Sequence, residues 1–358
     1  MTRRVLVARL DSDGDVLLAG PALRAVAAGR PGEPTEVTLL CGPAGAQAAR
    51  MLPGVDHVMV WACPWIVANP HPVDPADVRE LVERVAAGRF DLAVVLTSAH
   101  QSSLPLALVL RLAGVPRTVA ISHDYPGTLL DVRLRPGTDF VDDAPEPERA
   151  LAVVAAAGYR LPEGDDGALR VNPPPDVSPI VGEGPYLVLH PGATVPARRW
   201  PAWRCAEAVR ALAAEGHRVL VTGGPGERDL TAEVAGDAGV DLGGATGFAE
   251  LAGVLAGARA VVVGNTGPAH LAAAVGTPVV SLFSPVVPAL RWAPYRVPSV
   301  LLGDQTAPCR ATRARDCPVP GHPCLASVTA RNVIDAVHAL TGTAVTEKPR
   351  TEGTHTCV

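Results

Sequence analysis

Residues 261–283, VVVGNTGPAHLAAAVGTPVVSLF, decide the fold of this chain. The apolar run over 260–263 predicts a buried strand, and the glycine-flanked turn over 264–267 ends it. A helix is predicted over 268–274 and a second strand over 278–282. A strand, a helix and a further strand in this order predict an α/β sheet.

The turn in this stretch predicts an anion site. Pro268 is tolerated in the first turn of a helix, and Asn265 or Thr266 can cap the free amides before it. Gly264 and Gly267 leave the backbone bare, so unpaired N–H groups and a positive helix end can face a phosphate or a diphosphate. An ordinary strand-to-helix turn is the alternative interpretation.

The amino terminus has a related arrangement. A mostly apolar strand over 4–10 is followed by DSDGD and by a helix with an apolar face over 16–28. Asp15 falls in the first helical turn, where the helix dipole stabilises its negative form, at the crevice end expected of a doubly wound sheet. We expect Asp11 and Asp13 to cap the helix and Asp15 to take part in the reaction, with helix capping by Asp15 as the alternative.

Length and composition favour two α/β domains. The 358 residues suffice for two cores, and 48% of them are hydrophobic. The mild net charge of −5, without a basic stripe, argues against nucleic-acid binding. No signal peptide and no membrane-spanning apolar run is visible. The sequence therefore predicts a cytoplasmic monomer without a cofactor, and it leaves open a peripheral contact at the inner membrane face.

Strand and helix candidates alternate in two series, which predicts two parallel sheets with covered faces. The composition shifts to proline, glycine and acidic residues over 161–183, which predicts a linker and hinge. We therefore expect a first domain over 1–160, a second over 184–342 and a mobile tail over 343–358. Predicted strands lie over 5–10, 36–40, 57–61, 92–96, 117–121, 186–190, 218–222, 240–242, 260–263, 279–282 and 299–302. Predicted helices lie over 16–28, 45–51, 75–87, 104–112, 146–157, 202–215, 228–235, 249–256, 268–274 and 330–340.

Six motifs occur in order along the chain. They are LDSDGDVLLAGPA at 10–22, HPGA at 190–193, RRWP at 198–201, TGGPGE at 222–227, GNTGPAH at 264–270 and GTPVV at 276–280. With these motifs the chain resembles the bacterial heptosyltransferase family, glycosyltransferase family nine, over nearly its whole length. The resemblance implies a GT-B fold, in which two Rossmann-like domains with parallel sheets face each other across a cleft, and a final helix that crosses back to the first domain. It also implies a transferase that moves a heptose-like sugar from an ADP-sugar to a saccharide or glycolipid acceptor, as in lipopolysaccharide core biosynthesis.

The resemblance places the donor site on the second domain. Arg198 and Arg199 follow the strand over 186–190, where two guanidiniums can fork onto diphosphate oxygens; a solvated pair is the alternative. Relatives usually have Lys at the position of Arg198 and Asp at that of Asn265. Glu227 is expected to accept hydrogen bonds from ribose hydroxyls, with helix capping as the alternative. The expected donor-binding residues are Thr194, Arg198, Arg199, Glu227, Thr246, Asn265, Thr266, Gly267 and His270.

The resemblance also implies inverting transfer with Asp15 as the general base, a role worth typically ~10²–10⁴ in rate. We expect an exposed carboxylate of ordinary pKa, which acts as the acceptor hydroxyl acidifies in the transition state. No carboxylate pair ends a strand of the second domain, so no metal is expected to bridge the diphosphate. Polar loops over 97–103 and 122–127 follow strands at the crevice end. Acceptor contacts are expected from His100, Gln101, Asp124 and Tyr125, although ordinary loop residues would give the same pattern.

Three cysteines cluster near the end of the chain. Cys309, Cys317 and Cys324 lie in CRATRARDCPVPGHPC together with His322, but their spacing lacks the short knuckle of zinc sites. We expect free thiols, with a disulfide or a metal site as alternatives.

Two other functions remain open at this point. The first is a nucleotide-sugar epimerase of the same two-domain fold. The second is a non-catalytic nucleotide-sugar-binding protein, against which Asp15 argues. Turnover of the donor without an acceptor would distinguish the epimerase from the transferase.

Overall fold

The computed structural model describes residues 2–67 and 69–342, so the tail predicted over 343–358 lies outside the described residues. Two six-stranded sheets form, and neighbouring strands pair parallel throughout both. In spatial order the first sheet consists of β3 (His57–Val60), β2 (Thr35–Cys41), β1 (Arg3–Arg9), β4 (Leu92–Val95), β5 (Thr118–Ile121) and β6 (Val132–Leu134). The second consists of β12 (Ser299–Leu302), β11 (Val279–Leu282), β10 (Val261–Gly264), β7 (Leu187–His190), β8 (Val219–Gly223) and β9 (Val240–Gly243).

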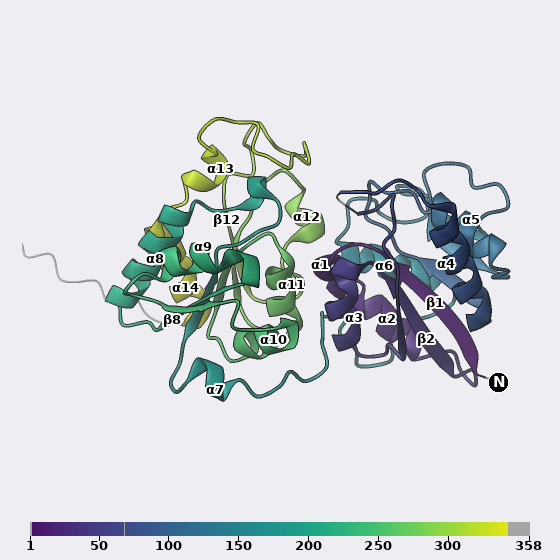
Figure 1. Cartoon of the computed structure of the whole chain (residues 1–358), viewed down its shortest axis with the longest axis horizontal. Helices are drawn as coiled ribbons and strands as arrows, with labels where there is room; N and C mark the ends of the chain where they lie inside the picture. Colours follow the sequence, from purple (N-terminus) through teal and green to yellow (C-terminus); the bar gives the residue numbers. More distant parts are fainter. Residues whose placement is uncertain (1, 68, 343–358) are drawn as a thin grey trace, which may run out of the picture.

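Both sheets have the strand order of a doubly wound nucleotide-binding fold, which confirms the predicted α/β class. Figure 1 shows them in two lobes that lie side by side, here called the first and the second lobe. The strands agree with the predicted ranges within two residues at each end, except β6, which was missed because three residues between loops carry no periodic pattern.

Helices cover both faces of each sheet. Those of the first lobe are α1 (Asp13–Leu18), α2 (Gly20–Ala27), η1 (Pro43–Gly45), α3 (Ala46–Met51), α4 (Pro75–Gly88), α5 (Leu104–Leu112) and α6 (Glu146–Ala156). The second lobe contains η2 (Pro196–Arg198), α8 (Ala202–Ala214), η3 (Pro225–Glu227), α9 (Arg228–Ala235), α10 (Phe248–Ala256), α11 (Gly267–Ala274), α12 (Ala289–Trp292), α13 (Pro323–Ala326) and α14 (Ala330–Thr341). The short helix α7 (Ser178–Val181) lies within the predicted linker. None of the helices in the described ranges is long and apolar enough to pass through a bilayer.

Alternating side chains of the strands fill separate layers of the core. In β1, Val5 and Val7 pack with the inner helices α1 and α2, whereas Leu6 and Ala8 pack with α4 and α5. In β7, Val188 joins the same inner layer, which also includes α10 and α11. The inner layer is therefore continuous from one sheet to the other, and it brings α1 and α11 together between the lobes (Figure 1).

The single helix predicted over 16–28 is wrong. The helix begins at Asp13 instead, and it is interrupted before Gly20, where a second helix begins. Pro21 explains the interruption, because proline has no N–H to continue the ladder of the preceding helix and fits the first turn of a new one.

The predicted capping roles of Asp11 and Asp13 are also wrong. Ser12 is the N-cap residue of α1. Asp11 forms an ion pair with Arg9 at 3.0 Å, and Asp13 accepts a hydrogen bond from the Ala48 amide at 2.9 Å. The carboxylates of the turn after β1 are thus held by Arg9, which is close in sequence, and by the distant Ala48 amide.

The predicted return of the last helix to the first domain is wrong as well. Helix α14 packs on α8 and on β11 and β12 of the second sheet. Its apolar face lines the core of the second lobe through Val333, Ile334 and Val337. An amphipathic helix buries its stripe on the nearest apolar surface, and here the second sheet supplies it.

Candidate active site

A cavity of about 330 Å³ lies between the lobes, at the carboxyl ends of β1, β4, β7 and β10. In each sheet two of these strands flank the point where the strand order reverses, which is where doubly wound sheets bind ligands. The lining includes Ser12, Gly14, Asp15, His100 and Gln101 from the first lobe and Thr194, Arg198, Asn265, Thr266, Gly267, His270 and Arg313 from the second.

Asp15 has two partners beside this cavity. Its Oδ1 accepts a hydrogen bond from Arg9 Nη2 at 2.9 Å, and its Oδ2 accepts one from the Ser12 hydroxyl at 3.0 Å. Burial acts to raise the pKa of Asp15, but Arg9 and Ser12 outweigh burial and hold the pKa below its ordinary value. The expected exposed aspartate of ordinary pKa is therefore wrong: the side chain is 21% exposed and ionised at neutral pH.

Arg9 is a buried cation that orients this carboxylate. Besides Asp15, its guanidinium lies 3.0 Å from Asp11 Oδ2 and 3.6 Å from Glu146 Oε2, and it donates to the Ser98 hydroxyl at 2.8 Å. Burial opposes its charged form, but the three carboxylates outweigh burial and raise the pKa of Arg9. The planar fork of five donors allows one side chain to serve all these partners.

The charge network continues from Glu146 to the second lobe. Arg149 Nε lies 3.3 Å from Glu146, and its Nη1 lies 2.6 Å from Asp142 Oδ1. Arg291, on α12 of the second lobe, lies 3.3 Å from Asp142 and 3.1 Å from Asp143. Alternating charges therefore link Asp15 to a contact between the lobes.

The lobes meet where α1 and α11 begin (Figure 1). A Cβ atom added to Gly14 would lie 3.0 Å from His270 Cδ2 and 3.2 Å from Gly267 Cα, so any larger residue would require the second lobe to shift by a few tenths of an ångström. His270 is buried, and burial lowers its pKa to about 4 although Asp15 acts in the opposite direction. A neutral imidazole therefore faces the Asp15 carboxylate across the interface.

Four side-chain atoms on the second-lobe lining are buried without a hydrogen-bond partner, as judged within the described ranges. They are Arg198 Nε, Asn265 Nδ2, Thr266 Oγ1 and His270 Nδ1. Unmet buried polar groups are rare in proteins, and several together indicate a missing partner. The first two are donors and the threonine hydroxyl can donate, so a partner rich in acceptor oxygens fits them.

Two arginines add positive charge at the same place. Arg198 ends η2, and Arg313 lies in the loop between β12 and α13, where it donates to His100 Nε2 at 2.9 Å. Burial lowers the pKa of both arginines, while Asp15 acts to raise both. Burial and Arg313 together lower the pKa of His100 to about 4, so His100 accepts from Arg313 as a neutral ring.

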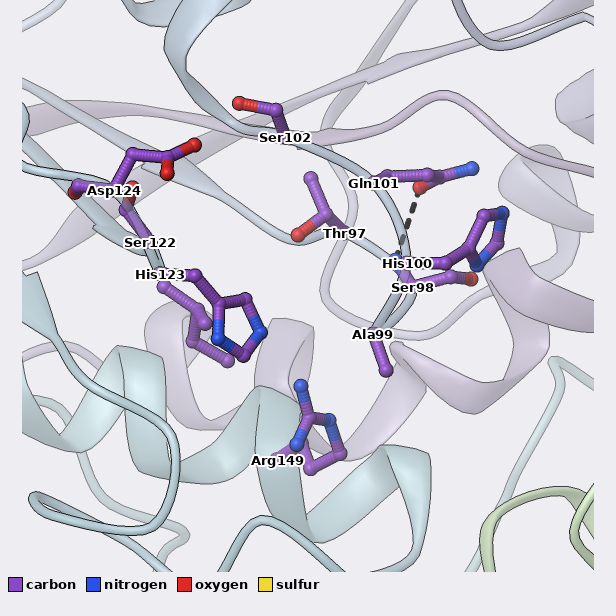
Figure 2. Close-up of a pocket in the computed structure, with 11 residues that line it drawn as sticks. Thr97, Ser98, Ala99, His100, Gln101, Ser102, Ser122, His123, Asp124 and Arg149 are labelled. Carbon is purple, nitrogen blue, oxygen red and sulfur yellow. Dashed lines mark hydrogen bonds between the residues drawn. The ribbon is translucent and has the colours of Figure 1, made fainter.

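A smaller cavity of about 140 Å³ lies in the first lobe, between the loops that follow β4 and β5 (Figure 2). His100 and Gln101 line both cavities, and Asp124 lines the smaller one. Gln101 is fixed by the Ser98 amide, which donates to its Oε1 at 3.0 Å. Tyr125 is 85% exposed and lines neither cavity. The polar lining suits hydroxyl-rich ligands such as sugars.

A family comparison adds to this geometry. The sequence profile of glycosyltransferase family 9 (heptosyltransferase) matches residues 78–322, which is more than half of the chain. The chain belongs to glycosyltransferase family 9. The resemblance drawn from the six sequence motifs is thereby confirmed.

Curated family 9 relatives share moderate identity with this chain. Lipopolysaccharide heptosyltransferase 1 of Pseudomonas aeruginosa is 37% identical over 171 residues, which are 45% of this chain and 46% of the relative. Lipopolysaccharide heptosyltransferase 2 of Escherichia coli is 28% identical over 233 residues, which are 59% of this chain and 64% of the relative. The matches thus span about half to nearly two thirds of these two relatives.

A solved heptosyltransferase structure shares the fold. The Escherichia coli heptosyltransferase WaaC with ADP-2-deoxy-2-fluoro heptose superposes with a TM-score of 0.67 at 22% identity, covering 94% of this chain and 99% of the other. The predicted GT-B fold, with two Rossmann-like domains facing across a cleft, is confirmed.

Three predicted donor residues of this family 9 chain lie outside the 330 Å³ cavity. Arg199 Nε donates to the Ala193 carbonyl at 2.7 Å, and Glu227 Oε2 accepts from the Gly224 amide at 2.9 Å. The capping alternative for Glu227 is therefore realised in the structure. Thr246 follows β9 at the same edge of the sheet. Nucleotide contacts by these residues stay a prediction.

Sequence analysis missed two cations and a hydroxyl of the family 9 site. Arg9 lies within the apolar strand RVLVARL, and a lone arginine there signals a buried charge with a partner. Ser98 belongs to the polar loop over 97–103, in which only His100 and Gln101 were predicted to contact the acceptor. Arg313 lies in the cysteine-rich stretch, between two elements of secondary structure, where no sequence pattern marks it as a cleft residue.

Within the described ranges no cysteine forms a disulfide, whereas the choice between free thiols and a metal site stays a prediction. Cys309 and Cys324 are buried and Cys317 is partly exposed. Burial raises the pKa of Cys324 to about 11, so this thiol is protonated at neutral pH. Cys357 lies outside the described residues.

Proposed function

We propose that this chain is an inverting glycosyltransferase that moves a heptose-like sugar from an ADP-sugar to a saccharide or glycolipid acceptor without a metal ion. The names of the curated relatives support a heptose-like sugar, and the ADP-sugar analogue in the solved relative supports ADP as its carrier. One observation carries the proposal: an ionised Asp15 shares a cavity with buried, unpartnered donors of the opposite lobe.

The donors of the second lobe bind the diphosphate. Arg198 Nε and Asn265 Nδ2 donate to its oxygens, together with the Thr266 hydroxyl and the positive N-terminal end of α11. These groups are fixed before the reaction, so they stabilise the negative charge that develops as the bond between sugar and diphosphate breaks. Arg198 and Arg313 supply two positive charges, which is why a bridging metal is not required.

Asp15 accepts the proton of the attacking acceptor hydroxyl. The acceptor oxygen forms its bond to the anomeric carbon on the side opposite the diphosphate, which inverts the configuration. Arg9 and Ser12 each use one hydrogen bond to the carboxylate, which leaves lone pairs for the acceptor hydroxyl. Because the pKa of Asp15 is low, proton transfer occurs late, as the hydroxyl acidifies in the transition state.

The two lobes divide the substrates in this proposal. Residues 184–342 bind the nucleotide-sugar, and Glu227 and Thr246 extend that site along the same sheet edge. Residues 1–160 bind the acceptor, with His100, Gln101 and Asp124 lining its cavity. Residues 161–183 connect the two parts and act as the hinge.

Donor turnover tests the reaction class. The purified chain is incubated with ADP-heptose, with and without saccharide acceptors, and ADP release and the anomeric configuration of the product are followed. Acceptor-dependent ADP release with inversion supports the proposal. Sugar isomerisation without an acceptor would favour the epimerase, and donor binding without turnover across an acceptor panel would favour a binding protein.

Nucleotide preference is a second, independent readout. A ligand at 100 times its dissociation constant stabilises the folded state by about 2.7 kcal/mol, which a thermal-shift assay resolves. ADP should raise the Tm more than UDP or GDP at equal concentration. A preference for UDP would remove the ADP-sugar from the proposal.

A further inference from the structure

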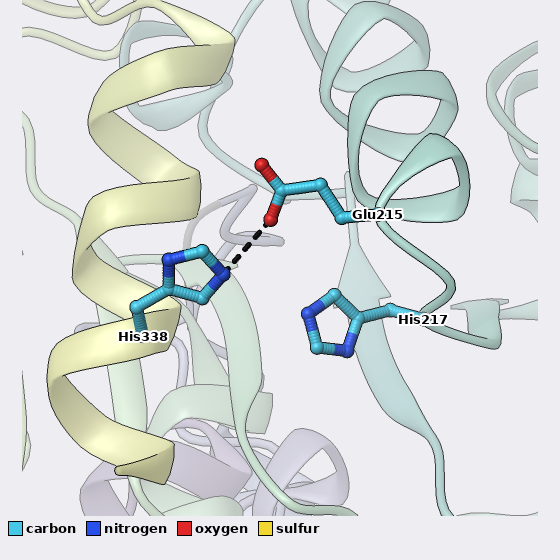
Figure 3. Close-up of side chains that lie close together, drawn as sticks. All are labelled: Glu215, His217 and His338. Atoms are coloured by element: carbon cyan, nitrogen blue, oxygen red, sulfur yellow. Dashed lines mark ion pairs between the residues drawn. The ribbon is translucent and has the colours of Figure 1, made fainter. Parts of the chain in front are cut away.

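Three metal-ligating side chains converge on the second lobe, on the side away from the first lobe (Figures 1 and 3). Glu215 is the C-cap residue of α8, His217 follows two residues later, and His338 lies in the last turn of α14. One ligand atom from each lies within 4.8 Å of the others. Glu215 Oε2 and His338 Nε2 are 2.8 Å apart, and the two imidazole centroids are 6.1 Å apart.

The backbone fixes two of these groups before any ion binds. The His217 amide donates to the Leu212 carbonyl at 3.1 Å and the Gly216 amide to the Ala213 carbonyl at 2.9 Å, which is the pairing of a Schellman motif. Gly216 has a φ of +87°, which glycine adopts without strain. The third group is held by the packing of α14 on α8.

We propose that Glu215, His217 and His338 form a binding site for a divalent transition metal of the zinc class. Two imidazoles and one carboxylate match the ligand preferences of Zn²⁺, whereas Mg²⁺ and Ca²⁺ take mainly oxygen ligands. Bonds of about 2.1 Å in a tetrahedral site separate ligand atoms by about 3.4 Å, so small side-chain rotations from the observed spacing suffice. Water takes the fourth position, because Glu215 is exposed.

This site is separate from the cleft and does not depend on the proposed transfer reaction. The bound ion joins α14 to the C-terminal end of α8 and so adds a link between the last helix of the described chain and the helix on which it packs. Arg259 lies close enough to act on His217, and its positive charge opposes a cation. We therefore expect weaker binding than at a site without a neighbouring cation, but tighter binding than by a lone His–Glu pair.

Calorimetric titration of the EDTA-treated, dialysed full chain with ZnCl₂ tests the site. We expect one equivalent to bind, and His217→Ala and His338→Ala each to weaken binding by more than roughly tenfold. His57→Ala is the matched control, because His57 pairs with Glu36 at 2.9 Å but belongs to no three-ligand cluster in the described residues. Circular dichroism establishes that each variant is folded.

Cobalt substitution distinguishes this site from the free thiols. Co²⁺ bound here should show visible d–d bands without thiolate charge-transfer absorption. Hydrogen exchange of residues 330–342 should slow with ZnCl₂ in the wild type and in His57→Ala, but not in His338→Ala. Absence of zinc binding, or binding that survives both histidine substitutions, would overturn the assignment, as would thiolate bands in the cobalt spectrum.

Discussion

Arg9→Met removes the guanidinium that holds Asp15 and tests how the general base is tuned. Asp15 works in its ionised form, so activity falls as the pH drops through its pKa. In the wild type the pKa of Asp15 is depressed, and the pKa values of His100 and His270 are about 4. None of these three groups therefore changes its charge between about pH 5 and 8, and kcat/KM should be flat over that range. Methionine fills a similar volume but leaves the carboxylates of Asp11 and Glu146 uncompensated, which raises the pKa of Asp15.

The size of the change follows from the lost hydrogen bond at 2.9 Å. A charge-assisted hydrogen bond contributes roughly 1.5–3 kcal/mol, and 1.36 kcal/mol corresponds to about one pH unit in a titration. The acid limb of kcat/KM, measured by coupled ADP release, should therefore move up by roughly one to two pH units in Arg9→Met. Arg9→Lys keeps the positive charge but loses the planar guanidinium with its several donors. The acid limb of kcat/KM should therefore move less in this variant than in Arg9→Met.

Arg24→Met is the matched control for loss of a buried ion pair. Arg24 binds Asp165 at 2.7 and 2.9 Å, and both side chains are about as buried as Arg9, but they lie outside the cleft lining. This variant should lose stability without any change in the pH profile. A folded Arg9→Met protein whose acid limb coincides with that of the wild type would refute the role given to Arg9.

Three further predictions concern the cleft. Asp15→Asn should lower turnover by ~10² or more with little change in donor binding, measured by calorimetry with ADP; near-normal turnover would remove Asp15 as the base. Arg198→Ala should weaken ADP binding by roughly tenfold to a hundredfold and leave adenosine almost unaffected, and equal losses for both ligands would mean that Arg198 does not bind the diphosphate. Transfer should survive EDTA; loss of activity that magnesium or manganese restores would show that a metal holds the diphosphate.

The sheets were predictable because their information is local. Parallel strands that are covered on both faces appear as apolar runs between glycine-rich turns, as in VVVG of β10, and their carboxyl ends mark the cleft. The break before Gly20 could have been inferred from Pro21. The course of α14 could not, because its apolar stripe fits either sheet and only the tertiary packing selects one.

The cleft was predictable where a residue stands in a strand-to-helix turn, as Asn265 and Thr266 do, or in the first turn of the helix that follows, as Asp15 does. Arg9 and Arg313 could not be placed, because some of the groups that hold them lie far away in sequence: Ser98 and Glu146 for Arg9, and His100 for Arg313. The low pKa of Asp15 was not predicted because Arg9 and Ser12, although close in sequence, reach its carboxylate only through the fold of the turn after β1. A sequence pattern locates the carboxylate, but its neighbours in space determine its proton affinity.

The approach of Gly14 to α11 means that a single codon limits how closely the two lobes meet beside the cleft. A methyl group at this position would have to displace the His270 ring or the Gly267 backbone by a few tenths of an ångström. Such a displacement would change the separation of the lobes while the residues proposed to bind the diphosphate and to accept the proton stay the same. Natural or directed evolution could therefore act on substrate size through a substitution of Gly14, without replacing the residues proposed to bind the diphosphate or to accept the proton.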